Sequence, residues 1–448
     1  MGSAGPQSKS PCRSGISPPG SLAGLLGEFR SCSNAWTFPV FCALACGLVT
    51  QLGRQTVCGM LVGARLNGVW SHHRAHRFFS HARWSVDKLC TVLAALVVRL
   101  LADQDSPVLV AIDDTLFRRR GPKVHAASWF HDGSAKGERT VGYGNNWVIL
   151  AIVVHLPFLE RPVAIPVGFS LVVKAKGEPS RPEAACRLVE ALGGALGERR
   201  IDVVADCAYA GKVLRTLPES VTWTTRLKPN AGLYERKPGR TGQRGRPREK
   251  SKKLEPLSVL ADNQTFHSVD VRRYGKDQTV KVAVLHCLWY RVLGKQEVQV
   301  VFVRDKKKAG YDIALVSSDL SASPVALIER YAARWSIEIA IEDAKQLVGV
   351  GQARNRVKLA VERTVPFGLI VGSLAVCWYA TAGHHPDDVD SVREVAPWYR
   401  GKTQPSVLDI LAKLRRVVIA AQFRSTCPLP ATPAEIDVLR LAWEDVAA

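Results

Sequence analysis

The sequence predicts an α/β protein: a mixed sheet, preceded by a helical region and followed by a helical tail. Apolar residues recur at helical spacing from residue 22 to about residue 102. A short, continuous apolar run at 108–112 and a largely apolar stretch at 201–205 are then typical of strands buried on both faces. A helical pattern at 181–196 separates these two runs, and this alternation of strands with a helix indicates an α/β domain.

Later segments add strands and then long helices. Four stretches between residues 265 and 316 alternate as consecutive antiparallel strands do, and helical patterns follow at 324–347, 357–379 and 407–421. The expected order is a disordered low-complexity tail at 1–21, a helical, DNA-binding region at 22–105, the first part of the core at 106–216, a β-rich insertion at 217–320, the last part of the core at 321–380 and a helical tail at 381–448.

The charge of the chain predicts a polyanionic partner. Its formal net charge is +21, which is typical of proteins that meet nucleic acid. The alternative is that the charge serves solubility, although acidic residues serve that purpose better. The 11 cysteines show no zinc-ligand spacing, so we expect reduced thiols and a cytoplasmic protein. No signal peptide is expected, and the apolar runs at 36–49 and 365–380 are too short for a membrane span, so we expect buried helices and no membrane.

Two aspartates follow the two buried strands. Asp114 closes the first strand and Asp206 the second, and ligands bind at strand ends in open sheets. Buried carboxylates are costly unless they are neutralised, and hard oxygen ligands suit Mg²⁺ or Mn²⁺ rather than zinc. Alternatives are an Asx-turn at 113–115 and a helix N-cap at Asp206. Asp113 competes with Asp114, because adjacent strand residues point in opposite directions.

A polar stripe runs along the predicted helix at 324–347. Tyr331, Glu338 and Lys345 are seven residues apart and share one stripe, with Arg334 beside it. An ordinary Arg–Glu pair on a solvated face would give the same pattern. Glu342 competes with Glu338 as a ligand, one turn away and offset by roughly 40°.

A second stripe on the same helix is apolar. It consists of Ile328, Trp335 and Ile339. We expect these three side chains to face the core, as the apolar side of an amphipathic helix does.

The spacing Tyr331-x2-Arg334-x3-Glu338-x6-Lys345 resembles the Tyr-Arg-Glu-Lys signature of a large branch of bacterial insertion-sequence transposases of the DDE type. Residues 111–115 and 203–209 resemble the segments that carry the two aspartates of that group, and the resemblance extends from about residue 20 to 380. It implies a ribonuclease-H-like core with a β-rich insertion between the second aspartate and the glutamate.

The resemblance also assigns roles. Asp114, Asp206 and Glu338 would be catalytic and hold two Mg²⁺ or Mn²⁺ ions, with Asp114 preferred to Asp113 because it stands just before Thr115. The other three signature residues, Tyr331, Arg334 and Lys345, would hold phosphates of the transposon end.

The function implied is DNA transposition. The enzyme would cleave transposon ends by metal-dependent phosphodiester hydrolysis and join the freed 3′-hydroxyl to target DNA. Its partners would be double-stranded DNA, as inverted-repeat ends and target, and a second copy of the chain on that DNA, in the bacterial nucleoid. One alternative is a non-catalytic DNA-binding descendant, which the intact carboxylates disfavour. The other is a ribonuclease-H-like nuclease without strand transfer, which the basic insertion and the long N-terminal region disfavour.

Two basic segments are candidate DNA contacts. The segment 226–253 holds 11 Lys and Arg against 2 Glu. Within it, Gly245-Arg246-Pro247, flanked by Arg244 and Arg248, resembles the core of a minor-groove hook. This segment could either insert into the minor groove or contact the DNA backbone alone. The basic, aromatic and His-rich stretch 70–81 suits contact with a nucleic acid backbone, and equally a helix end with a satisfied histidine cluster.

Overall fold

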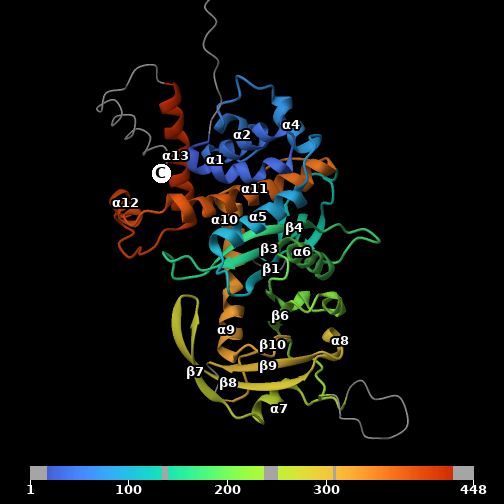
Figure 1. The fold of residues 1–448 in the computed structure, drawn as a ribbon. Helices are drawn as coiled ribbons and strands as arrows, with labels where there is room; N and C mark the ends of the chain where they lie inside the picture. The colour runs from blue at the N-terminus through green and yellow to red at the C-terminus, as the bar shows by residue number, and fades with distance from the viewer. Residues whose placement is uncertain (1–17, 134–139, 237–250, 306–308, 427–448) are drawn as a thin grey trace, which may run out of the picture.

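The computed structural model describes residues 18–133, 140–236, 251–305 and 309–426. Helices from both ends of the sequence gather at one end of an elongated molecule, and the strands of the predicted insertion form the other end (Figure 1). The central sheet lies between them. The predicted disordered tail, apart from its last residues, lies outside the described residues.

The N-terminal region is helical, as predicted. It comprises α1 (Gly20–Gly27), the 3₁₀ turn η1 (Glu28–Cys32), α2 (Thr37–Thr50), α3 (Val57–Gly63), α4 (His72–Ser80) and α5 (Val86–Leu101). Two glycines let α2 and α3 approach closely, because a Cβ on Gly63 would lie 2.2 Å from the carbonyl oxygen of Gly47. The chain therefore turns between these helices where the apolar pattern alone suggested continuity.

The central sheet contains the two predicted buried strands. Its strands are β1 (Val108–Arg118), β2 (Ser128–His131), β3 (Val141–Val154), β4 (Val163–Leu171), β5 (Ile201–Ala205) and β6 (Val221–Arg226). β1 pairs with β3 in antiparallel and with β5 in parallel orientation, and β5 pairs in parallel with β6. Helix α6 (Arg181–Leu196) connects β4 to β5, and the short 3₁₀ turns η2 (Cys207–Tyr209) and η3 (Lys212–Thr216) follow β5. The sheet is therefore mixed, as predicted.

The insertion extends this sheet and does not form a separate one. It holds α7 (Leu257–Asp262), β7 (His267–Arg273), β8 (Lys276–Leu288), α8 (Tyr290–Leu293), β9 (Glu297–Arg304) and β10 (Ile313–Ser317). The strand order is β2-β3-β1-β5-β6-β10-β9-β8-β7, with β4 beside β3. The predicted boundary at residue 217 places β6 in the insertion, whereas its parallel pairing with β5 makes it a strand of the central sheet.

The C-terminal part is helical. It comprises α9 (Pro324–Ala333), α10 (Trp335–Gln346), α11 (Lys358–Trp378), the π-helical turn η4 (Tyr379–Gly383), α12 (Asp388–Val395) and α13 (Val407–Thr426). The helix predicted at 324–347 is thus divided at Arg334. Within the described ranges, one helix, 358–383, is long and apolar enough to cross a membrane, and 78% of its most apolar window is buried inside the protein. This agrees with the buried helix predicted at 365–380.

Candidate active site

Asp113 and Asp114 point to opposite faces of β1. Asp113 Oδ2 lies 3.5 Å from Arg334 Nη1, on the face covered by α10. Asp114 faces the other way, where its Oδ1 accepts a hydrogen bond from the Tyr209 hydroxyl at 3.0 Å and its Oδ2 one from the Asn146 amide at 2.8 Å. Of the two rival aspartates, Asp113 and not the preferred Asp114 therefore lies on the face of the signature helix.

The pairing between β1 and β5 explains why Asp113, and not Asp114, faces the same side as Asp206. Ile112 is the register partner of Ala205, so the next step along both strands brings Asp113 level with Asp206. Register partners on parallel strands direct their side chains to the same face. The sequence held this signal, because each aspartate directly follows the apolar stretch of a buried strand, at 108–112 for Asp113 and at 203–205 for Asp206.

Asp206 caps the turn after β5, as one alternative proposed, and it also faces the signature helix. Its Oδ1 accepts a hydrogen bond from the N–H of Ala208 at 2.9 Å. Burial would raise the pKa of Asp206, but hydrogen bonds from Ala208 and Cys207 and the positive charge of Arg334 and Arg226 hold that pKa below its usual value. A capping role and a place in the site therefore occur together.

Arg334 lies at the centre of the three carboxylates. Its Nη2 donates to Glu338 Oε1 at 2.6 Å, and its side chain is only 13% exposed. Burial raises the pKa of Asp113 to about 6; the positive charge of Arg334 lowers this pKa, and the negative charges of Asp114 and Glu338 raise it. Asp113, Asp206 and Glu338 thus all interact with one largely enclosed guanidinium. We call these three carboxylates and Arg334 the carboxylate site.

The other two signature residues lie on either side of this site. The Tyr331 ring centroid is 5.8 Å from Arg334 Cζ, and burial raises the pKa of the Tyr331 hydroxyl. Lys345 Nζ lies 5.4 Å from the ring of Phe117, which is on the same face of β1 as Asp113, and burial lowers the pKa of Lys345. Because Arg334 keeps helical φ and ψ angles, all four signature residues lie on the side that faces β1 and the end of β5.

Two residues of the predicted apolar stripe do not face the core. Trp335 is 48% exposed and Ile339 is 39% exposed, whereas Ile328, Ile337 and Ile341 are buried. Arg334 itself keeps helical φ and ψ angles of −51° and −36°, but α9 contacts β7, β10, β5 and β6 whereas α10 contacts β4, β1 and α11, so the side that faces inward differs between the two helices. Of the three predicted core residues, only Ile328, on α9, is where the pattern placed it.

Replacement of Trp335 by alanine is therefore expected to cost less than about 1 kcal/mol of stability, as surface substitutions usually do. Ile337→Ala is the matched comparison on the same helix, because it empties a fully buried position. Urea denaturation of both variants measures the difference. If Trp335→Ala were as unstable as Ile337→Ala, the exposed position of Trp335 would be wrong.

Glu342, the rival of Glu338, is turned to solvent. Its Oε1 accepts a hydrogen bond from Gln346 Nε2 at 2.8 Å, one turn further along α10. Arg334 instead binds Glu338 directly, through its Nη2. The geometry therefore favours Glu338 as the carboxylate of the site.

A buried ion-pair network fixes the signature helix against the sheet. Arg330 on α9 binds Asp202 on β5 at 3.0 Å and Asp319 at 2.7 Å, and both aspartates are buried. Arg200 binds the same two carboxylates, and the Thr222 hydroxyl donates to Asp202 at 2.6 Å. Because Asp206 directly follows β5 and Arg334 directly follows α9, this network joins the two elements from which the carboxylate site is built.

Sequence reasoning did not assign Arg226 to the site. β6 pairs in register with β5 at Thr224 and Val204, so Arg226 is level with Asp206. The signal was available, because Arg226 ends a buried strand as Asp206 does. The predicted DNA-contact residues Arg244, Arg246 and Arg248 lie outside the described residues.

The mixed sheet, its helices and the carboxylate site are consistent with a DDE nuclease fold. The chain belongs to the DDE superfamily endonucleases, whose family model matches residues 38–289, more than half of the protein. The matched span contains Asp113 and Asp206 and ends before Glu338. Among solved structures, the chain is similar to the piggyBac transposase in a synaptic complex with hairpin DNA, with 13% identity, a TM-score of 0.40, and coverage of 93% of this chain and 79% of that chain. No curated protein matches the sequence.

Proposed function

We propose that this protein is a DNA transposase that cleaves transposon ends by metal-dependent hydrolysis and joins the 3′-hydroxyl to target DNA. The observation that carries the proposal is the carboxylate site itself, in which Asp113, Asp206 and Glu338 come from β1, the end of β5 and α10 and share Arg334. A mixed sheet with this arrangement supports a ribonuclease-H-like core and the Tyr-Arg-Glu-Lys type of signature. Asp113 replaces Asp114 in the role of first catalytic carboxylate.

The residues of the site fit a divalent cation. Asp113 is a half-buried carboxyl whose pKa of about 6 reflects burial and neighbouring negative charge, so added positive charge would stabilise its ionised form. Oxygen ligands from two aspartates and a glutamate suit Mg²⁺ or Mn²⁺, and we propose two such ions. Bound there, the ions would activate a water or a 3′-hydroxyl and stabilise the leaving oxygen of an in-line displacement.

The chain's own cations would bind the DNA backbone. The Nε–H of Arg334 is buried and has no hydrogen-bond partner within the described part of the chain, so the guanidinium keeps one donor that the carboxylates do not use. Burial lowers the pKa of Lys345, and a nearby phosphate would favour its charged form. Tyr331 would donate its hydroxyl to the same strand. These three residues would position the scissile phosphate, and the carboxylates would act on it.

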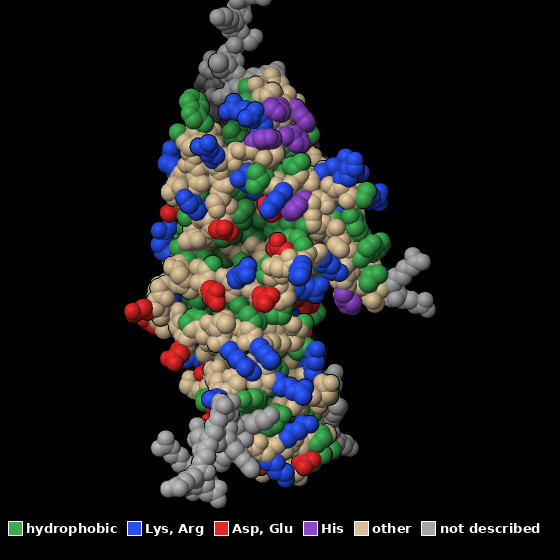
Figure 2. All heavy atoms as spheres, turned by 90° about the vertical axis from the view of Figure 1, so that its right-hand side faces the viewer, with side chains coloured by type: hydrophobic (Ala, Val, Ile, Leu, Met, Phe, Trp, Pro, Cys, Tyr) green, Lys and Arg blue, Asp and Glu red, His purple; other side chains and the backbone are tan. Residues whose placement is uncertain are grey.

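The surface charge is compatible with long DNA contacts. Figure 2 shows Lys and Arg side chains over much of one face, with carboxylates interspersed across its middle. The net charge of +21 supports binding of transposon ends and target as double-stranded DNA. We propose that two copies assemble on that DNA, in the bacterial cytoplasm.

The decisive experiment is a cleavage assay on DNA that carries the element's inverted repeats, with Mg²⁺ and with EDTA. Cleavage at the ends and a joined product on target DNA, both dependent on Mg²⁺, are expected. Cleavage without a joined product would identify a nuclease, and binding without cleavage would identify a non-catalytic DNA-binding protein. Either result would overturn the proposal.

Neutralising Arg244, Arg246 and Arg248 together should weaken DNA binding and reduce its salt dependence. For every phosphate that the variant no longer neutralises, the slope of log K against log salt should become shallower by roughly 0.9. Binding titrations at several salt concentrations measure the slope, and the wild-type protein provides the reference. An unchanged slope would show that this loop does not bind the DNA backbone.

A further inference from the structure

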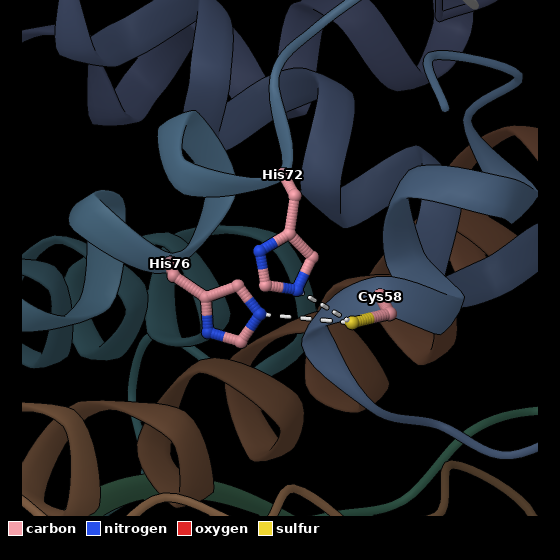
Figure 3. Close-up of side chains that lie close together, drawn as sticks. All are labelled: Cys58, His72 and His76. Carbon is pink, nitrogen blue, oxygen red and sulfur yellow. Dashed lines mark hydrogen bonds between the residues drawn. The ribbon is translucent and has the colours of Figure 1, made fainter. Parts of the chain in front are cut away.

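Three side chains of metal-ligand type converge on the surface of the N-terminal helices. Cys58 lies on α3, and His72 and His76 lie one turn apart on α4 (Figure 3). Cys58 Sγ is 3.3 Å from His72 Nε2 and 3.6 Å from His76 Nε2. The three ligand atoms all lie within 4.8 Å of one another. In Figure 2, His side chains gather over the helical end of the molecule. The carboxylate site uses none of these three residues.

The separations match those of a tetrahedral zinc site. Zinc bonds of about 2.3 Å to sulfur and about 2.0–2.1 Å to nitrogen, at a tetrahedral angle, place sulfur and nitrogen about 3.6 Å apart. Both observed separations are close to this value. The Cys58 thiol can donate a hydrogen bond to only one of the two imidazoles, because a thiol has one proton. The second of the two short contacts therefore needs another explanation. A single ion would accept a lone pair from all three atoms.

The local fold holds these side chains in place before any ligand binds. On α3, the Thr56 hydroxyl caps the helix by accepting from the N–H of Gly59 at 3.0 Å, and a Cβ on Gly59 would lie 2.2 Å from the carbonyl oxygen of Arg54. Residue 59 must therefore be glycine for the turn that presents Cys58. On α4, the i, i+4 spacing places His72 and His76 on one face, with ring centroids 4.2 Å apart.

The far end of α4 is fixed as well. Arg363 on α11 donates to the carbonyl oxygens of Ala82 at 2.9 Å and Trp84 at 2.7 Å, directly after the helix. At the other end of α4, Trp70 packs against the hydrophobic core and Arg74 Cζ lies 4.0 Å from the centroid of its ring. α3 has 7 residues and α4 has 9, and helices this short are marginal without tertiary support. A bound ion would add a direct link between the two helices at this end, beyond the packing that they already share.

We propose that Cys58, His72 and His76 bind a zinc ion, with water as the fourth ligand, and that the ion fixes α4 against α3. One thiolate and two imidazoles are the borderline-soft donors that zinc prefers, whereas Mg²⁺ and Mn²⁺ prefer oxygen and belong at the carboxylate site. Cys58 and His72 are exposed, so the fourth position is open to solvent. The ion thereby supports the helix that carries Arg74 and Arg77, and this role does not depend on the proposed transposase activity.

The test uses the full-length protein, zinc and Co²⁺ as a spectroscopic probe. Wild type is expected to retain one equivalent of zinc after gel filtration and, with Co²⁺, to give the thiolate charge-transfer band and the visible bands of a tetrahedral site. Cys58→Ser should lose the charge-transfer band, and His76→Asn should bind zinc at least 10-fold more weakly. His73→Asn is the matched control, because His73 is on the same helix but outside the cluster.

Two further measurements keep the result interpretable if a variant folds poorly. Zinc, but not Mg²⁺, should raise the Tm of wild type and of His73→Asn, because a ligand that binds the folded state stabilises it. Zinc should also protect Cys58, which is exposed, from alkylation, as followed by peptide mass spectrometry. Absence of zinc binding in wild type, or wild-type cobalt spectra in Cys58→Ser, would overturn the proposal.

Discussion

Asp113→Asn is expected to abolish DNA cleavage, whereas Asp114→Asn should leave cleavage measurable. Asp113 faces Arg334 and Glu338, and replacing its carboxylate by an amide removes a ligand from the carboxylate site. Even residues that only orient metal ligands cost 10–100-fold when they are changed, so a direct ligand should cost more than about 100-fold. Asp114 instead binds Tyr209 and Asn146 on the opposite face. Single-turnover cleavage in Mg²⁺ compares the two variants.

The stability of Asp113→Asn provides the control for folding. The pKa of Asp113 is about 6 in the folded protein, above its value in the unfolded chain, so the folded state binds the extra proton and this carboxyl lowers stability as pH rises through that range. The amide should therefore melt no lower than wild type at neutral pH, and the difference should disappear below about pH 4. Mg²⁺ should raise the Tm of wild type and not that of Asp113→Asn.

The opposite pattern would reverse the assignment. If Asp114→Asn lost both DNA cleavage and the stabilisation by Mg²⁺ while Asp113→Asn kept both, Asp114 would be the metal ligand. The two faces of β1 would then have to exchange sides when DNA binds. Loss in both variants with normal melting would show that the two adjacent carboxylates act together. The two residues differ by one position in the sequence, so the comparison is closely matched in all but the face of the sheet.

Much of the fold could be predicted because its elements carry local signals. Helix α6 begins at Arg181 after a Ser180–Glu183 capping box, and the strand at 201–205 is apolar apart from Asp202. Pairing of β6 with β5 could not be predicted from residues 217–226 alone, because long-range pairing has no local pattern. The same applies to the division of α9 from α10 at Arg334, since residues 324–347 have continuous helical periodicity.

The residue types of the candidate site could be predicted from the sequence, but the directions in which all of its side chains point could not. Glu338 and Asp206 lie where their positions on the helix and at the strand end placed them relative to Arg334. The choice between Asp113 and Asp114 depended on which face of β1 meets α10, and that is a property of tertiary packing. In the cluster of Cys58, His72 and His76, the first two residues are 14 positions apart, so no short ligand spacing revealed it.

Arg330→Met is expected to cost about 3–5 kcal/mol of stability, because removing one partner of a buried ion pair leaves an uncompensated buried charge. Asp202 and Asp319 are 4% and 3% exposed, and Arg200 would remain as one cation for two buried carboxylates. Burial would raise the pKa of Asp319, but Arg330, Ser321 and Arg200 hold it below its usual value. The stabilisation that this shift reports is present at neutral pH and lost in acid.

The matched control is Arg393→Met. Arg393 binds Asp390 at 2.6 Å, as short a distance as those of Arg330, but both side chains are largely exposed. Such a pair is worth about 0–1 kcal/mol. Urea denaturation at neutral pH should therefore separate the stabilities of the two variants clearly. This difference should narrow below about pH 4, as Asp319 becomes protonated. Equal stability of the two variants would mean that α9 does not depend on this network.

The network joins α9 to β5, the strand directly before Asp206. Loss of the network should therefore move Arg334 and Glu338 away from Asp113 and Asp206. An Arg330→Met protein that still folds should then cleave DNA more slowly, although none of these four residues is changed.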